Sequence, residues 1–153
     1  MAAERIVVGV DGSHTSLHAL RWALAEARVR EAAVEAVHVW RYPVWIYSPM
    51  ILSPPALAHD DLVAEAHIAL DHAVDEVLAG EHDRAVVERT VLEGVTADQL
   101  LKHAKDADLL VVGHRGRGGF AGLLLGSVAT QCASHAGCPV VIVRCAAEHR
   151  GAS

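Results

Sequence analysis

The chain alternates short runs of consecutive apolar residues with longer stretches in which apolar residues recur at helical spacing. The first run, residues 5–11, reads Arg-Ile-Val-Val-Gly-Val-Asp and is apolar on both faces that a strand presents. A strand of this kind is buried from both sides, which is typical of a parallel sheet. The same pattern predicts strands at residues 5–11, 34–40, 84–92, 108–113 and 139–143.

Helical spacing fills the stretches between these runs. Ser13 is a suitable N-cap for a helix whose apolar face carries Leu17, Leu20, Leu24 and Ala27. Three further helices are expected: from Asp60 or Asp61 to Leu78, from a cap at Thr96 through Leu100, Leu101 and Ala104, and from Gly126 and Ser127 to Gly137.

Strands and helices therefore alternate along most of the chain. This order predicts the α/β class: a single domain with an open five-stranded parallel sheet, helices on both faces and the Rossmann-like strand order 3-2-1-4-5. We expect the domain to cover residues 1–145 and residues 146–153 to form a loose tail. Ligands of such sheets bind at the carboxyl ends of the strands beside the topological switch point, where Asp11 and Gly113 fall.

One segment, between Arg41 and His59, does not fit a regular element. It contains Pro43, Pro49, Pro54 and Pro55, which predict a long loop. The aromatic residues in and beside it are Trp40, Tyr42, Trp45 and Tyr47. These rings fit a lid over a bound base or a partner surface, and they fit equally a cover for exposed core at the sheet edge.

Composition narrows the class of protein. Of 153 residues, 52% are hydrophobic and 21% are charged, which excludes a disordered chain. Apolar runs reach only about six residues, whereas a membrane helix needs roughly 20. Glu4, Arg5 and Asp11 interrupt the amino-terminal segment, so no secretory signal is expected.

Net charge and cysteine spacing argue against a nucleic-acid partner and against a zinc or thioredoxin-type cysteine site. The net charge is −6 and the 13 basic residues are scattered, so nucleic acid is not an expected partner. Cys132, Cys138 and Cys145 lack the spacing of a zinc or thioredoxin motif, which fits structural thiols in a reducing cytoplasm. His14 and His18 do have metal-ligand spacing, but with no third ligand evident we interpret them as a solvated helix face and expect no metal site.

Candidate chemistry lies in residues 113–127, a glycine-rich loop between a buried strand and a helix. Gly113 and Gly116 are expected to adopt positive φ and to let the backbone approach a ligand closely. Free amides at the helix start, with the hydroxyl of Ser127, would hold a phosphate group. A Walker A loop is excluded because the lysines, Lys102 and Lys105, lie elsewhere, and a match to the dinucleotide GxGxxA pattern lacks the expected acid near position 136.

These residues resemble the universal stress protein family, and specifically its nucleotide-binding branch. The signature of that branch, Gly, two residues, Gly, nine residues, Gly and then Ser or Thr, stands here as Gly113, Gly116, Gly126 and Ser127. Four other segments look like family features in family order: residues 7–13, 38–39, 107–113 and 138–143.

The resemblance implies an adenine nucleotide, ATP first and otherwise ADP, AMP or cyclic AMP, with Mg²⁺. It places the adenosine part near Gly9, Val10 and Asp11, the base at Val39 and the ribose at Gly113. It places the phosphates at Gly116, Gly126, Ser127 and Val128. Ala129 departs from the family, where a second hydroxyl residue is common, which leaves AMP and cyclic AMP open. Arg115 and Arg117 could reach phosphates or point into water.

The resemblance also implies a homodimer through the edge strand Val140–Val143. We expect a cytoplasmic, regulatory stress-response module whose function is binding. Two rival functions are a slow ATP hydrolase, for which Asp11 and His114 are the available groups, and a dimeric interaction protein with a vestigial pocket.

Overall fold

The computed structural model describes residues 2–42, 59–82, 85–117 and 124–145. It contains a parallel five-stranded sheet with the order β3-β2-β1-β4-β5, which confirms the predicted class and strand order. The elements are β1 Arg5–Gly9, α1 His14–Arg30, β2 Ala33–Trp40, α2 His59–Ala79, β3 Val87–Glu93, α3 Thr96–His103, β4 Leu109–Gly113, α4 Ser127–His135 and β5 Val140–Val143.

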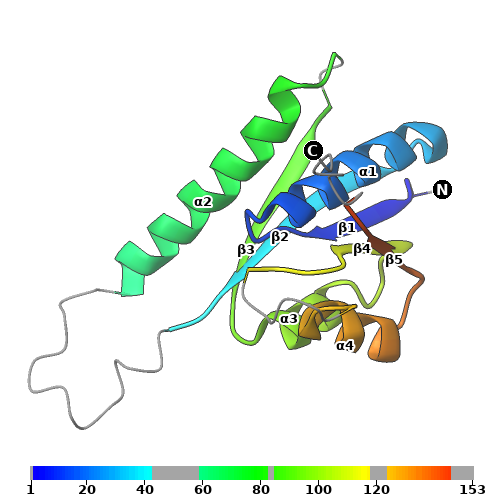
Figure 1. Ribbon diagram of the computed structural model, residues 1–153. Helices are drawn as coiled ribbons and strands as arrows, with labels where there is room; N and C mark the ends of the chain where they lie inside the picture. The colour runs from blue at the N-terminus through cyan, green and yellow to red at the C-terminus, as the bar shows by residue number, and fades with distance from the viewer. Residues whose placement is uncertain (1, 43–58, 83–84, 118–123, 146–153) are drawn as a thin grey trace, which may run out of the picture.

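The helices cover both faces of this sheet, as the apolar residues on both faces of the central strands β1 and β4 require. Ile6, Val7 and Val8 of β1 are each 0% exposed, because successive side chains enter opposite layers. One layer packs β1 against α1 and α2, and the other packs it against α3 and α4. Figure 1 shows α1 and α2 on one side of the sheet and α3 and α4 on the other.

The ends of the helices show where local sequence rules held. Ser13 caps α1, and its hydroxyl accepts a hydrogen bond from the Ser16 amide, as predicted. Thr96 was wrongly expected to be a cap: it is the first helical residue, and the cap position is Val95, whose side chain makes no capping bond. Apolar spacing places a helix well but fixes its terminal residues only within one or two positions.

Other boundaries also moved by a few residues. α2 begins at His59 instead of Asp60 or Asp61 and reaches Ala79, and α4 ends at His135 instead of Gly137. β1 ends at Gly9 and β3 begins at Val87, both shorter than expected at that end. The central part of the predicted proline-rich loop and the predicted tail lie outside the described residues.

The three cysteines are free thiols. Cys132 is 0% exposed inside the layer formed with α3 and α4, and burial raises its pKa to about 11. This agrees with the predicted structural role for that residue. Within the part of the chain that the structure describes, none of the helices has both the length and the apolar character needed to cross a bilayer.

Candidate functional site

A pocket of about 530 Å³ opens at the carboxyl ends of β1, β2 and β4, beside the first turn of α4. The sheet order places the topological switch point between β1 and β4, since the chain runs outward from β1 through β2 to β3 and then returns to β4. Both the location and the volume are those expected of a small-molecule site in an open α/β sheet.

The structure gathers around this pocket every residue that the sequence analysis assigned to nucleotide binding. They come from segments far apart in the chain: Gly9, Val10, Asp11, Val39, Gly113, Arg115, Gly116, Gly126, Ser127 and Val128. Sequence reasoning missed Ser16, Val37, Thr96, Leu100 and Val112, which also line it. Val37 lies two residues before Val39 on the same strand face, so strand periodicity could have found it.

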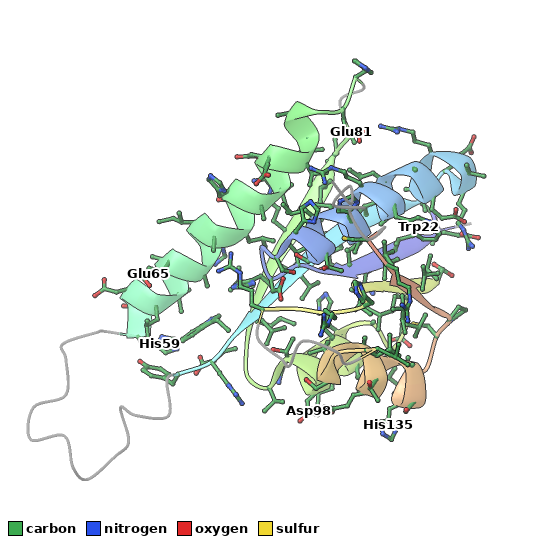
Figure 2. All side chains as sticks on the ribbon, in the orientation of Figure 1. Trp22, His59, Glu65, Glu81, Asp98 and His135 are labelled. Carbon is green, nitrogen blue, oxygen red and sulfur yellow. The ribbon has the colours of Figure 1, made fainter. Side chains whose placement is uncertain are left out.

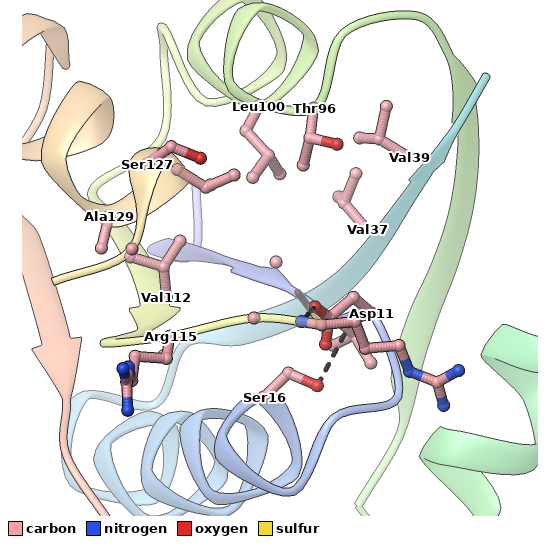
Figure 3. Close-up of a pocket in the computed structure, with 17 residues that line it drawn as sticks. Asp11, Ser16, Val37, Val39, Thr96, Leu100, Val112, Arg115, Ser127 and Ala129 are labelled. Atoms are coloured by element: carbon pink, nitrogen blue, oxygen red, sulfur yellow. Dashed lines mark hydrogen bonds between the residues drawn. The ribbon is translucent and has the colours of Figure 1, made fainter. Parts of the chain in front are cut away.

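One part of the pocket is apolar. Val37 is 1% exposed, Leu100 2% and Val112 3%, and together with Val39 they form a hydrophobic wall. Figure 3 shows Val37, Val39 and Thr96 at one end of the pocket and Ser127 and Ala129 at the other. A flat aromatic group fits the first end, because burial against aliphatic side chains removes its faces from water.

The other end is the amino terminus of α4. Gly126 is its N-cap residue and makes no side-chain capping bond, while its own amide donates to the carbonyl of His114 over 2.7 Å. Ser127, Val128 and Ala129 form the first turn and line the pocket. Amides of a first turn have no intrahelical acceptor, and the helix end carries about half a positive charge, so an anion is favoured here.

Asp11 joins the two loops that border the pocket. Its carboxylate accepts hydrogen bonds from the backbone amides of Ser13 and Arg117, both over 2.9 Å. Burial by itself would raise the pKa of Asp11, but hydrogen bonds from Ser13, Arg117 and Ser16 outweigh it and hold the pKa below its ordinary 3.8. The carboxylate is therefore ionised at neutral pH and fixes the glycine-rich loop against the end of β1.

The glycines of the loop are required for a different reason from the one predicted. Neither Gly113 nor Gly116 has positive φ; the described glycines that do are Gly12 and Gly94. A Cβ on Gly113 would lie 2.7 Å from Thr15 Cγ2, and one on Gly116 would lie 2.7 Å from Asp11 Oδ2. These positions therefore allow protein segments to approach each other, which brings β4 and its loop against α1 and Asp11.

The two arginines of the loop both line the pocket but differ in direction. Figure 3 shows the guanidinium of Arg115 pointing away from Ser127 and from the first turn of α4. In Arg117, Nη2 lies 2.9 Å from the place that a Cβ on Gly12 would occupy, so the guanidinium covers that turn. Reaching an anion at the first turn of α4 would require Arg115 to change rotamer.

His114, the second group considered for catalysis, does not line the pocket. Its Nδ1 is buried and has no hydrogen-bond partner among the described residues. His38 is instead hydrogen-bonded at the end of β2, with its Nδ1 2.9 Å from the carbonyl of Val10. The structure therefore brings neither histidine into the lining of the site.

The aromatic residues near the end of β2 pack beside the start of α2. The rings of Trp40 and Tyr42 lie 5.4 and 5.6 Å from that of His59, whose Nε2 is 2.7 Å from Glu93 Oε2. Neither aromatic residue lines the pocket. Trp45 and Tyr47, the other members of the predicted cluster, lie outside the described residues.

The fold and the site together define an open α/β domain with a ligand pocket at the switch point of its sheet. The model of the universal stress protein family matches residues 2–144, and the chain belongs to this family.

Curated relatives and solved structures agree with this assignment. Universal stress protein Rv2623 of Mycobacterium tuberculosis is 37% identical over 142 residues, which are 91% of this chain and 44% of that protein. Rv1996 of the same species is 32% identical over 90% of this chain and 47% of its own length. The chain thus spans less than half the length of these relatives.

Among solved structures, a universal stress protein in complex with cAMP has a TM-score of 0.67 and 29% identity, covering 94% of this chain and 98% of its own. A universal stress protein from Archaeoglobus fulgidus in complex with dAMP has a TM-score of 0.63 and 26% identity, covering 93% and 98%. Hypothetical protein MJ0577, at 22% identity and a TM-score of 0.73 over 95% and 99%, supports the fold.

Proposed function

We propose that this chain binds an adenine nucleotide, ATP with Mg²⁺ in the first place, and acts as a cytoplasmic regulatory module whose occupancy changes its interactions. The observation that carries the proposal is one pocket with two unlike ends. Its apolar wall suits a base, and the uncapped first turn of α4 suits phosphates. The cAMP and dAMP complexes of similar proteins support an adenine ligand.

Each end has its own part in binding. The base lies along Val37, Val39 and Leu100, with the backbone of Val39 supplying polar contacts, and the ribose lies at Gly113. The phosphates lie at Gly116 and at the first turn of α4, where amides and the Ser127 hydroxyl donate to them. Asp11, Gly9 and Val10 face the adenosine part, where the ionised carboxylate of Asp11 can accept hydrogen bonds from hydroxyl groups.

A monophosphate is the second candidate. Ala129 occupies the first turn of α4 at a position that lines the pocket and offers no hydroxyl. With fewer side-chain donors for phosphate oxygens, the affinity for a triphosphate exceeds that for AMP or cyclic AMP by a smaller factor. The ligands named for the two similar structures, cAMP and dAMP, each carry one phosphate.

Catalysis is expected to be slow. Among the described residues that line the pocket, Asp11 is the acidic side chain, and two backbone amides already occupy its carboxylate. Phosphoryl transfer needs a group free to orient a nucleophile. We expect hydrolysis of bound ATP far below about 1 per second, the low end of ordinary turnover numbers.

Calorimetric titration with ATP, ADP, AMP and cyclic AMP, each with and without Mg²⁺, tests the proposal. We expect one nucleotide per chain, with ATP and Mg²⁺ binding most tightly. If AMP or cyclic AMP binds more tightly than ATP, the ligand is a monophosphate, the second candidate. Failure of all four to bind at millimolar concentration would overturn nucleotide binding and favour a vestigial pocket.

Replacing Gly116 tests the placement of the phosphates. In Gly116→Val the new Cβ meets the Asp11 carboxylate, so the loop must move, and we expect nucleotide affinity to fall at least about 10-fold. Gly137→Val is the matched control, because a Cβ there comes only within 3.8 Å of Lys105 O, an ordinary contact. Calorimetry measures affinity, and thermal melting checks the fold. Unchanged affinity in Gly116→Val would place the phosphates elsewhere.

A further inference from the structure

A second cluster of chemically active side chains lies outside the pocket, on the first turns of α1. His14 and His18 are one helical turn apart, with ring centroids 4.6 Å apart. Cys145, just after β5, brings its Sγ to 3.8 Å from Nδ1 of His14. Each of the three residues offers one ligand atom, and these atoms all lie within 4.8 Å of one another.

This spacing is close to that of ligands on one metal ion. Tetrahedral Zn²⁺ with bonds of about 2.0–2.1 Å to nitrogen and 2.3 Å to sulfur places nitrogen and sulfur about 3.6 Å apart and the two nitrogens about 3.3 Å apart. The sulfur and the His14 nitrogen already nearly match, at 3.8 Å. Because His14 is exposed and His18 and Cys145 are only partly buried, small side-chain rotations can close the remaining difference.

The backbone around the cluster is held on both sides. The Ser13 cap fixes the start of α1, and Thr15, between the two histidines, packs against Gly113. On the other side, the carbonyl of Val143 accepts a hydrogen bond of 2.9 Å from the His114 amide, which fixes the end of β5 two residues before Cys145. The three ligands therefore come from an anchored helix and an anchored strand end.

The side-chain types in this cluster determine which metal ion it can bind. Two imidazoles and a thiolate suit Zn²⁺, whereas Mg²⁺ and Ca²⁺ require oxygen ligands. The helix end, with roughly half a positive charge, and Arg21 one turn beyond His18 oppose a cation. The full negative charge that the Cys145 sulfur acquires on losing its proton to solvent offsets them.

We propose that His14, His18 and Cys145 form a Zn²⁺ site whose fourth position is open to water or an incoming ligand. None of the three residues lines the pocket, so this site does not depend on the proposed nucleotide function. Three protein ligands with an open fourth position give a metal that can exchange or accept another ligand, unlike a closed four-ligand structural site.

The test uses metal-free protein without nucleotide. Zn²⁺ is titrated in competition with a chromophoric chelator, and Co²⁺ is added separately to look for the thiolate-to-metal absorption band. The variants are His14→Ala, His18→Ala and Cys145→Ser. Matched controls are His135→Ala, whose side chain Figure 2 shows projecting from α4, and Cys138→Ser, another partly buried thiol.

We expect one Zn²⁺ per chain, at least about 100-fold weaker binding in each of the three variants, and unchanged binding in both controls. The Co²⁺ band should disappear in Cys145→Ser. Circular dichroism checks that every variant is folded; the substituted side chains are at least partly exposed, so the fold should survive. Absence of Zn²⁺ binding, or binding that survives any one of the three replacements, would overturn the site.

Discussion

Glu35 is a charged residue buried inside the sheet, with only 6% of its side chain exposed. Its Oε1 accepts hydrogen bonds from Thr90 Oγ1 and His103 Nε2, both over 2.6 Å, and its Oε2 accepts one from Arg5 Nε over 2.9 Å. Burial alone would raise the pKa of Glu35, but these partners outweigh it and lower the pKa from its ordinary 4.5. The native state therefore favours the ionised carboxylate.

This network predicts an acid-sensitive part of the stability. Because the folded pKa is below the unfolded one, the unfolded state binds more protons in acid. The contribution of Glu35 is fully present above pH 4.5 and is lost as the pH falls through the lowered folded value. We expect Glu35→Gln to lower the free energy of unfolding by about 2 kcal/mol at pH 7, the scale of hydrogen bonds to a charged group.

Urea unfolding between pH 3 and 7 measures this difference, which should shrink as the pH falls below 4.5. The control is Glu88→Gln, which makes the same chemical change at the position paired with Glu35 in β3, on an exposed side chain. A pH-independent difference between Glu35→Gln and the unsubstituted protein would show that the network contributes nothing through ionisation.

Among the elements, α4 supplies the hydrogen-bond donors of the proposed phosphate site. Substitutions at Ser127 can remove either the hydroxyl alone or the hydroxyl and the backbone amide of its first turn. Ser127 is its first helical residue, and Gly126 before it is extended, with ψ 167°. Proline fits such a position, since the residue before it must be extended and the amide at the first helical position has no intrahelical acceptor. Ser127→Pro thus removes the amide and the hydroxyl together while keeping the helix.

Comparison of Ser127→Pro with Ser127→Ala separates these two donors. We expect the alanine variant to weaken ATP binding about 10-fold and the proline variant, which lacks both donors, at least about 100-fold, because a donor to a charged phosphate contributes about 1.5–3 kcal/mol. Calorimetry gives the affinities, and circular dichroism confirms that α4 persists. Equal ATP affinities in the unsubstituted protein and Ser127→Pro would show that the first turn of α4 does not bind the phosphates.

At the scale of the whole molecule, β5 is an edge strand next to β4, and all of its residues are partly exposed. An apolar edge strand offers unpaired backbone groups to another strand. We propose that β5 of a second copy covers this edge. Light scattering should then give the mass of two chains, and Ile142→Lys should shift the protein to a monomer by placing a charge in the interface.

The opposite edge provides a control for this dimer. Val86 precedes β3 and is 90% exposed, so Val86→Lys adds the same charge at the other side of the sheet. We expect Val86→Lys to leave the mass unchanged, and thermal melting to show both variants folded. A monomeric unsubstituted protein, or a dimer that persists in Ile142→Lys, would rule out β5 as the interface.

The amino-acid pattern alone was enough to predict the class of fold, the strand order and most of the residues that line the pocket, but not Ser16, Val37, Thr96, Leu100 or Val112. Runs such as 5–11 and 108–113 bury both faces, and this requires helices on both sides of a parallel sheet. The glycine signature identified the loop of residues 113–127 as a candidate site. Glycine has no Cβ, so other segments can approach its backbone closely. Boundaries at Thr96 and Gly137 were misplaced because local propensity is weak at helix ends.

Contacts between side chains far apart in the sequence became known from the packed fold alone. Asp11 accepts a hydrogen bond from Arg117, 106 residues away, and Cys145 reaches His14 across 131 residues. It also showed that Gly113 and Gly116 accommodate Thr15 and Asp11, without positive φ. Apolar periodicity reports which face of an element is buried, but the partner of a polar group depends on how the packed elements bring separate segments together.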